Sequence, residues 1–402
     1  MARDRINFFF LNLGHLFDHL FMLIFATVAA LALATEWGMT YGELIPYAMP
    51  GFVAFGIASI PAGWLADKWS RTRMMNVFFL GAGAASIATG FATTPLQIGA
   101  GLLVIGLFAA IYHPVGIAMV VHGRVKTGMP LAINGVFGNL GVASAALVTG
   151  VIIDLYGWRT AFIAPGVFAL GLGIAYWTFQ ASDKREVSEA KAQKSAGTAA
   201  MALDRNVLVL IFAIIFFTTA LGGLIFQSTT FALPKIFDER LGNLATSATE
   251  VGAWAFMVFT VAAFAQLVVG YLVDNHSVRT VFAFVAGLQA ILFFLMLELT
   301  GVAALVVSVG FMLVVFGQIP INDVLIGRIA KSEWRSRAYA VRSFITFTVM
   351  ASSVPMIAWL HATWGFTALF MVMCGVAVLI FLAVLKLPRT GAVLARAASP
   401  AE

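Results

Sequence analysis

Long apolar stretches follow one another along the whole chain, and each is long enough to cross a bilayer as a helix. The hydrocarbon core of a membrane is about 30 Å thick, which a helix of about 20 apolar residues spans. Of the 402 residues, 61% are hydrophobic and 10% are charged, whereas a soluble domain usually carries about 25% charge. One water-soluble core could not bury this much apolar surface. The sequence therefore predicts an all-α polytopic membrane protein without a soluble catalytic domain.

Twelve membrane helices fit these stretches. They are predicted over residues 6–34, 43–65, 74–92, 96–122, 129–153, 158–180, 206–233, 249–273, 278–298, 302–329, 337–361 and 366–386. The long polar segment between the sixth and seventh helices has the composition of a linker. We therefore predict a six-helix bundle over residues 1–180, a linker over 181–205, a second six-helix bundle over 206–388 and a tail over 389–402.

The basic residues are unevenly distributed over the loops that join these helices. If the N-terminus lies inside, all 24 Lys and Arg residues except Arg159, Lys235 and Arg240 fall on the cytoplasmic side. Cytoplasmic loops of membrane proteins carry an excess of Lys and Arg. The pattern predicts a multi-pass protein of the bacterial inner membrane with both termini in the cytoplasm.

Two short segments of the first half recur in the second half at nearly the same offset. The segment Gly63–Ser70 (GWLADKWS) is echoed by Gly270–Ser277 (GYLVDNHS), and Gly157-Trp158 is echoed by Gly365-Phe366. Both echoes fall at matching loop positions. Repeated halves with a site between them are typical of secondary transporters, so the echoes favour that class over a channel.

The loop Gly63–Arg73 (GWLADKWSRTR), called the Gly63 loop below, resembles the major facilitator superfamily signature G-x-L-A-D-x-x-G-R-[RK]. The matching positions are Gly63, Leu65, Ala66, Asp67 and Arg71, with Arg73 adding a second charge. Ser70 stands where the family usually has Gly. The resemblance implies the MFS fold, with 12 transmembrane helices in two pseudo-symmetric six-helix bundles. It also implies a monomer that transports by rocker-switch alternating access.

The chemistry of the Gly63 loop predicts a conformational latch. Gly63 allows a neighbouring helix to approach closely, and Asp67 can accept hydrogen bonds from the free N–H groups of a facing helix N-terminus. Arg71 and Arg73 can pair with Asp67 or with lipid phosphates. Asp274 keeps the acidic position in the second-half echo, which lacks the arginine. The alternative is a basic loop that only fixes membrane orientation.

Polar residues gather on one face of the helix predicted over residues 6–34. At about 100° per residue they fall within an arc of about 120°, and they are Asn12, His15, Asp18 and His19. Ionisable groups inside a span usually face a cavity or one another, and a His–Asp pair can hold and release a proton near neutral pH. We predict that this face lines the substrate cavity and that Asp18 and His15 couple transport to protons. A packing network without a transport role is the alternative.

The helix predicted over 96–122 contains Tyr112-His113-Pro114. Pro114 removes a backbone hydrogen bond and is expected to kink the helix beside His113. Together with Gly14-His15 and Asp18, this tripeptide is similar to the fosmidomycin-resistance-type branch of the superfamily. That resemblance implies efflux of a small organic or drug-like compound, with Tyr112 and His113 at the site. The alternative for His113 is a histidine satisfied within the core.

Four further polar residues are candidates for the substrate or coupling site. Asn134 lies on a stripe of small residues in the helix over 129–153, and Gln227 lies in the helix over 206–233. Asp323 is expected to pair with Arg342 or Arg328. Inside the cavity, Arg342 would anchor an anionic substrate; alternatively, both arginines extend to the membrane interface.

Other classes of function lack their parts in this sequence. We find neither a phosphate-binding loop nor a nucleophilic triad, so an enzyme, a cofactor and an ATP-driven pump are not predicted. The single cysteine, Cys374, excludes a cysteine cluster, and no resident metal is predicted. The preferred function is proton-coupled efflux of a small compound, and the alternative is uptake of a small organic anion. Uptake of a metal ion such as copper is less favoured. A membrane receptor is a rival class of function, and it predicts no transport of any candidate compound.

Overall fold

The computed structural model describes residues 2–122, 128–181, 205–329 and 335–388, and its regular structure over these ranges is helical throughout. The predicted tail over 389–402 and nearly all of the predicted linker over 181–205 lie outside the described residues. The side chain of Arg328 lies outside them too. The helical fold agrees with the class predicted from the apolar stretches.

The described residues before the linker are called the N-terminal half below. Its short π-helical segments are η1 and η3, and η2 is a 3₁₀ helix. Its elements are α1 (Ala2–Val28), η1 (Ala29–Leu33), α2 (Ala34–Trp37), α3 (Tyr41–Leu44), η2 (Ile45–Ala48), α4 (Met49–Lys68), α5 (Arg71–Gly90), α6 (Pro95–Ala109), η3 (Tyr112–Gly116), α7 (Ile117–Val121), α8 (Gly128–Tyr156) and α9 (Trp158–Ala181).

The described residues after the linker are called the C-terminal half. Its elements are α10 (Arg205–Arg240), η4 (Gly242–Leu244), α11 (Ala248–Asn275), α12 (Val278–Leu295), α13 (Gly301–Ile329) and α14 (Arg335–Val384). The last of these is broken at Gly365, whose backbone is not helical (φ 69°, ψ −169°). It therefore covers both of the helices predicted over 337–361 and 366–386.

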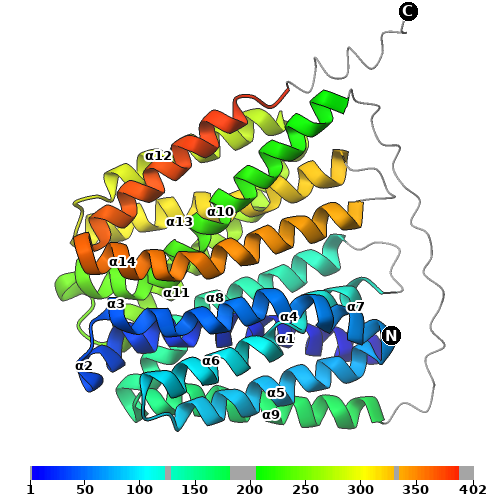
Figure 1. Cartoon of the computed structure of the whole chain (residues 1–402), viewed down its shortest axis with the longest axis vertical. Helices are drawn as coiled ribbons and strands as arrows, with labels where there is room; N and C mark the ends of the chain where they lie inside the picture. The colour runs from blue at the N-terminus through cyan, green and yellow to red at the C-terminus, as the bar shows by residue number, and fades with distance from the viewer. Residues whose placement is uncertain (1, 123–127, 182–204, 330–334, 389–402) are drawn as a thin grey trace, which may run out of the picture.

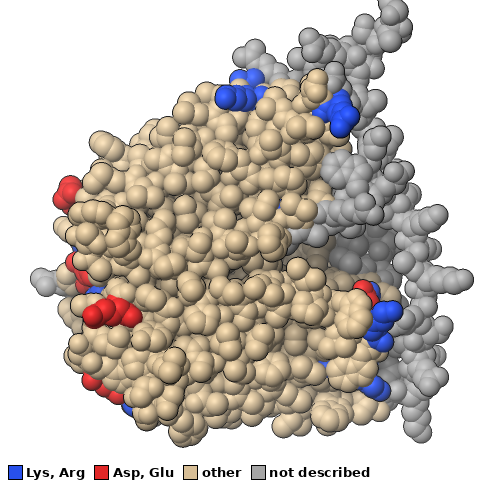
Figure 2. All heavy atoms as spheres, in the orientation of Figure 1, with Lys and Arg blue, Asp and Glu red and all other residues tan. Residues whose placement is uncertain are grey.

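Ten helical segments among the described residues are long and apolar enough to cross a membrane. The segment α5 is not among them, and α14 counts once, so the number twelve stays a prediction. Figure 2 shows that the surface between the two ends of the molecule carries few charges, whereas Lys, Arg, Asp and Glu gather at the ends. This apolar belt is the surface that a bilayer would cover.

Each half packs mainly on itself, and the most extensive contacts between the halves come from two helix pairs. In the N-terminal half α1 packs on α8, α5 on α9 and α4 on α6, and in the C-terminal half α10 packs on α14 and α11 on α13. Across the halves, α8 packs along α11 and α4 along α14. Figure 1 shows the two sets of helices one above the other, with the N-terminus at the opposite end from α2 and α3.

The local sequence explains where several helices begin. Gly157 and Gly365, the two glycines of the second echo, have φ values of 82° and 69°, a region that favours glycine. Both therefore turn the chain between consecutive helices in the same way. Ser70 caps α5, since its Oγ accepts a hydrogen bond from the Arg73 backbone N–H at 3.3 Å. The departure from the family's glycine thus supplies a helix cap.

Candidate functional site

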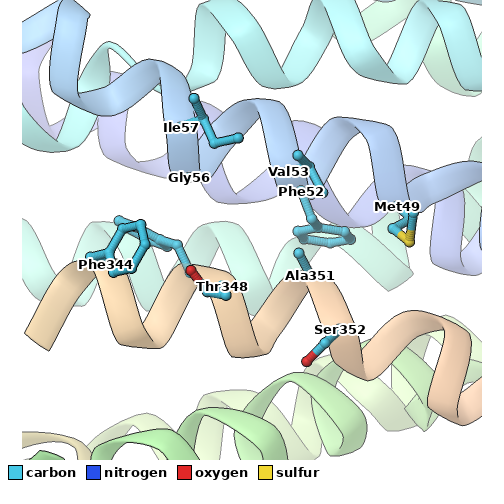
Figure 3. Close-up of a pocket in the computed structure, with 10 residues that line it drawn as sticks. Met49, Phe52, Val53, Gly56, Ile57, Phe344, Thr348, Ala351 and Ser352 are labelled. Atoms are coloured by element: carbon cyan, nitrogen blue, oxygen red, sulfur yellow. The ribbon is translucent and has the colours of Figure 1, made fainter.

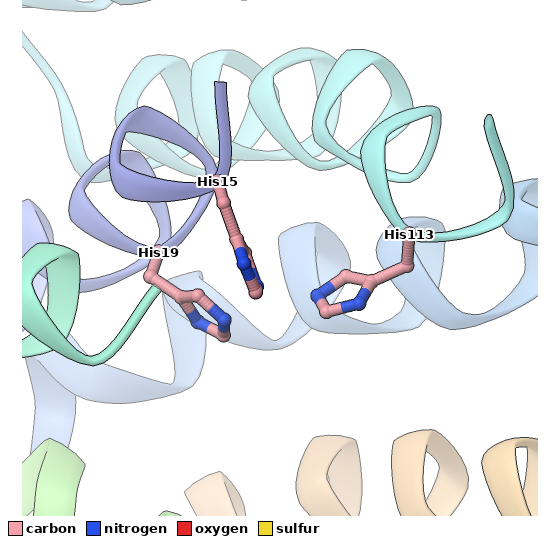
Figure 4. A group of neighbouring side chains, drawn as sticks. All are labelled: His15, His19 and His113. Carbon is pink, nitrogen blue, oxygen red and sulfur yellow. The ribbon is translucent and has the colours of Figure 1, made fainter. Parts of the chain in front are cut away.

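Three histidines from two elements meet near the middle of the N-terminal half. His15 and His19 lie one turn apart on α1, and His113 lies on η3. Their ring centres are 5.0 Å (His15–His19), 5.3 Å (His15–His113) and 5.5 Å (His19–His113) apart. Figure 4 shows the three rings directed into one space. These residues are called the histidine cluster.

Asp18 places a buried carboxyl group beside the histidine cluster. Its side chain is fully buried, and its Oδ2 lies 3.3 Å from Nε2 of His113, which is 26% exposed. A buried carboxylate is costly unless a positive group pairs with it. The sequence suggested His15 as a partner of Asp18, but the ion-pair contact is made by His113. The Asp18–His113 pair is therefore the natural place for a bound proton.

A hydrogen-bond network fixes His15 from behind. Its Nδ1 lies 2.7 Å from the backbone oxygen of Asn134, and a carbonyl oxygen only accepts, so Nδ1 carries the hydrogen. The Asn134 Nδ2 donates to Asn12 Oδ1 at 2.9 Å and to the Tyr112 hydroxyl at 2.8 Å. Tyr112 in turn donates to the Leu11 carbonyl at 2.8 Å. Four predicted site residues thus form one buried network.

Glycines make room for these rings. A Cβ at Gly138 would lie 2.6 Å from the His15 ring, and Cβ atoms at Gly14 and Gly116 would lie 2.9 and 2.7 Å from the Tyr112 ring. Side chains at these positions would displace the rings. The small-residue stripe of α8 therefore holds the site as well as packing the helices.

The kink expected at Pro114 takes the form of a π-helical turn, η3. Proline has no backbone N–H to donate, so the helix widens here instead of continuing its ladder. A Cβ at Gly63 would lie 3.2 Å from the Pro114 Cβ. Gly63 thus permits α4 to pack closely against η3 of its own half.

An ion pair of the C-terminal half joins α13 and α14. Arg342 on α14 places Nη1 3.0 Å from Oδ1 of Asp323 on α13, and their side chains are 21% and 40% exposed. The Arg342 side chain is therefore directed to α13. Its buried Nε has no acceptor among the described residues.

Three amide side chains of the C-terminal half are buried with polar atoms that have no partner in the described part of the chain, namely Gln227, Gln289 and Gln318. Gln227 on α10 is 1% exposed, and its Nε2 has no partner in the described part of the chain. Gln318 on α13 is 5% exposed, and neither of its amide atoms has a described partner. Gln318 was not predicted as a site residue; its position five residues before Asp323 was the signal.

A cavity of about 260 Å³ lies between the halves. Figure 3 shows it between α4 and α14. The Phe347 ring borders it and also lies 6.1 Å from the His113 ring and 5.0 Å from the Phe55 ring. The cavity therefore adjoins the histidine cluster. Its lining is mostly apolar and includes Met49, Phe52, Gly56, Phe344, Thr348 and Ser352.

Among the described residues, Asp67 of the Gly63 loop pairs within the loop. Its Oδ1 accepts from Arg71 Nη2 at 2.8 Å, whereas the sequence suggested a facing helix N-terminus as its partner. The Arg73 guanidinium lies 5.6 Å from the centre of the Trp69 ring. Asp274 is exposed near the end of α11.

The contact expected of Asp67 exists at the other end of the molecule, on a residue that the sequence analysis missed. Asp154 at the end of α8 accepts a hydrogen bond from the Thr249 N–H in the first turn of α11 at 2.7 Å. This contact joins the two halves.

Three glycines of α3, α8 and α11 bring the halves together at this end of the molecule. A Cβ at Gly150 would lie 2.2 Å from the Ala248 oxygen, one at Gly252 2.5 Å from the Ala146 oxygen, and one at Gly42 3.0 Å from the Ala358 oxygen. The region around these residues is called the closed end below. The sequence offered one signal for the closed end, because Gly150 stands one turn before Asp154. In the structure the N-terminus of α11 faces this turn.

The sequence as a whole identifies the family. Residues 11–243 and 215–401 match the profile of the Major Facilitator Superfamily. The chain belongs to this superfamily. This match confirms the predicted family and fold class. It also confirms the prediction of a multi-pass membrane protein that belongs to a transporter family and not to an enzyme family.

Similar proteins of known name agree with this assignment. A probable sulfoacetate transporter of Cupriavidus necator is 28% identical over 42% of this chain and 40% of its own length. A gallate transporter of Pseudomonas putida is 23% identical over 46% of this chain and 42% of its own length. The alignments thus span about two fifths of each relative.

A solved structure has the same fold. The crystal structure of a POT family transporter in complex with 5-aminolevulinic acid superimposes with a TM-score of 0.71 and 13% identity. It covers 94% of each chain. At this identity the likeness describes the fold alone.

Proposed function

We propose that this protein is a secondary transporter that takes up a small organic anion together with protons. The names of the relatives support the anion, since sulfoacetate and gallate are small carboxylates. They favour the organic-anion alternative over the predicted efflux of a drug-like compound.

The observation that carries the proposal is the Arg342–Asp323 pair on the C-terminal half. The guanidinium is held in place by Asp323 while its Nε–H has no described acceptor. A substrate carboxylate can accept this hydrogen bond, and arginine suits carboxylates because its donors form a planar fork. The apolar cavity begins at Phe344, two residues further along α14. It offers a place for the apolar part of the substrate.

The histidine cluster and Asp18 supply the proton site. His113 is partly exposed while Asp18 is fully buried, so a proton can reach the pair through His113. The Phe347 ring of α14 contacts His113, and a movement of the C-terminal half would change the surroundings of that histidine. This contact is the physical link that we propose between protonation and alternating access.

The proposal includes a topology and a division into domains. The N-terminal half corresponds to a bundle over 1–180 and the C-terminal half to one over 206–388. In this proposal the Gly63 loop and both termini lie in the cytoplasm, and the closed end faces the outside. The distribution of Lys and Arg supports a cytoplasmic Gly63 loop, because Lys68, Arg71 and Arg73 lie together there and cytoplasmic loops carry an excess of these residues.

The anion site is tested by substrate counterflow in proteoliposomes that contain the purified protein. Labelled gallate and sulfoacetate are expected to accumulate against an internal excess of the same anion. Arg342→Gln is expected to weaken the apparent affinity about tenfold to a hundredfold, because one charge-assisted hydrogen bond is lost. The matched control is Arg159→Gln, since Arg159 pairs with Glu36 on an exposed surface. Equal affinities in wild type and Arg342→Gln would contradict the anchor.

The proton site is tested in the same vesicles with an imposed pH gradient. Asp18→Asn keeps the shape of the side chain and removes its charge. We expect gradient-driven accumulation to fall to the level without a gradient, while counterflow without a gradient persists. A variant that still accumulates substrate under the gradient would show that Asp18 does not couple transport to protons.

Export of a drug-like compound is the second candidate. It is favoured by the branch resemblance, whose two motifs, Gly14-His15 with Asp18 and His113-Pro114, lie together in the structure. Export predicts that an opposite pH gradient drives a drug-like compound out of the vesicles, and that the two carboxylates show no counterflow.

A further inference from the structure

We infer that His15, His19 and His113 form a binding site for a divalent transition-metal ion of the Zn²⁺ class. The three side chains each offer a nitrogen, and these nitrogens all lie within 4.8 Å of one another. Imidazole is a preferred ligand of Zn²⁺, Cu²⁺ and Ni²⁺. The inference departs from the sequence analysis, which predicted no resident metal site.

The spacing of the rings fits a tetrahedral ion. If imidazole nitrogens bind at about 2.0–2.1 Å and each ring centre lies about 1.1 Å beyond its nitrogen, tetrahedral angles separate the ring centres by about 5.2 Å. The observed separations are 5.0, 5.3 and 5.5 Å. With His15 held by Asn134, rotation of the His19 and His113 rings about their Cβ–Cγ bonds can bring their nitrogens towards His15 Nε2 and leaves the ring centres nearly in place. The backbone is therefore already placed for coordination.

His15 is prepared as a ligand by its own hydrogen bond. Its Nδ1–H donates to the Asn134 carbonyl at 2.7 Å, so the neutral ring has its lone pair on Nε2. That Nε2 is buried without a hydrogen-bond partner in the described residues, and the residue is 7% exposed. A ring whose second nitrogen donates to a carbonyl is the usual arrangement of metal-binding histidines.

The charge balance also fits a cation. Asp18 is fully buried, and neither of its oxygens has a well-formed hydrogen bond among the described residues. A buried carboxylate needs a compensating positive charge, and a divalent ion beside His113 supplies one, as a proton on the Asp18–His113 pair does in its absence. With three protein nitrogens bound, a tetrahedral ion keeps one open position. His113, at 26% exposure, connects that position with the space around it.

Packing of three rings without a metal is the competing explanation. Ring packing accounts for the His15–Tyr112 stack, whose centres are 4.8 Å apart at 19°. It leaves the unpartnered His15 Nε2 unexplained, because a buried polar atom without a partner is costly. The metal site explains that atom, the ring triangle and the Asp18 charge together. The site does not depend on which compound the protein transports.

The test is a titration of the purified full-length protein in detergent with Zn²⁺, followed by calorimetry. Wild type is expected to bind one ion per chain. His19→Gln and His113→Gln are each expected to weaken binding at least about tenfold, since each removes a ligand. His276→Gln, at an exposed position at the end of α11, is the matched control and is expected to bind as wild type. Thermal unfolding without Zn²⁺ verifies that each variant is folded.

A spectroscopic measurement on the wild type decides the matter without any variant. Cu²⁺ bound to the protein is expected to show an electron paramagnetic resonance spectrum with coupling to three nitrogens. The inference is overturned if wild type binds no stoichiometric ion, if the cluster variants bind as tightly as wild type, or if bound Cu²⁺ has a single nitrogen ligand. These readouts measure no transport, so failure of the proposed anion uptake would leave them unaffected.

Discussion

The two ends of the molecule carry the same chemistry in different states. At the closed end, Asp154 of the N-terminal half accepts a hydrogen bond from the N–H of Thr249 in the first turn of α11, and glycines bring backbones of both halves into contact. At the Gly63 loop, Asp67 binds Arg71 of its own loop. Among the described residues, the halves are therefore joined at the closed end, whereas Asp67 pairs within its own loop. In the proposed transporter, contacts of the halves at one end define one of the two states that alternating access requires.

Phenylalanine contacts join the two halves between the two ends of the molecule. Phe52 meets Phe231 at 5.8 Å, and Phe55 meets Phe347 at 5.0 Å, so contact between the halves continues from the closed end to the level of His113. The histidine cluster therefore borders this line of contacts between the halves. A change at either end can reach it through α4 and α14.

The largest effect is expected from Gly150→Leu. A Cβ at Gly150 would lie 2.2 Å from the Ala248 oxygen, so a leucine must push α8 and α11 apart. Overpacking of this kind costs about 1–3 kcal/mol, which shifts a two-state equilibrium about 5- to 150-fold. Spin labels on α3 and α14 are expected to report longer distances at the closed end. Gly171→Leu is the control, because a Cβ there meets no atom within 4 Å; equal distances in both variants would refute the role of Gly150.

A smaller effect is expected from Asp154→Ala. The substitution removes a charged acceptor at the first turn of α11, an interaction worth about 0.3–1 kcal/mol at an exposed position. The population with a separated closed end is expected to rise about two- to fivefold in the same spin-label measurement. Asp154→Asn keeps an acceptor and is expected to give an intermediate value. A population in Asp154→Ala that matches wild type would mean that the glycine contacts alone hold this end.

The smallest change at the closed end is expected from Asp67→Asn. Because Asp67 binds Arg71 within one loop, its charge does not hold the halves in this state, and the spin-label distances should remain those of wild type. The transport rate should nevertheless fall, since the Gly63 loop is predicted to hold the opposite state. Lys68→Gln in the same loop is the control for a general loss of charge. A change of the closed-end distances in Asp67→Asn would show instead that Asp67 helps to hold the closed end together.

The helices were predictable because the bilayer imposes a length of apolar sequence on each of them. The polar face of α1 was also predictable, because Asn12, His15, Asp18 and His19 recur with the helical period. The pairing of Asp18 with His113 was not, because it depends on how α1 and η3 are rotated against each other. Asp154 was missed since a single acidic residue at a helix end has no periodic signal. Its partner is the backbone of a residue 95 positions away.

The π-helical turn at Tyr112–Gly116 has a consequence for how the chain tolerates change. A π turn holds one residue more than an α turn, and one residue corresponds to about 100° of helical rotation. Deleting one residue in this turn would shorten the segment and leave its apolar character unchanged. It would also rotate His113 by about a quarter of a circle relative to α7. The His113 ring would then lose either its contact with Asp18 or its position beside α4. The length of this segment, and not only its composition, is therefore under constraint.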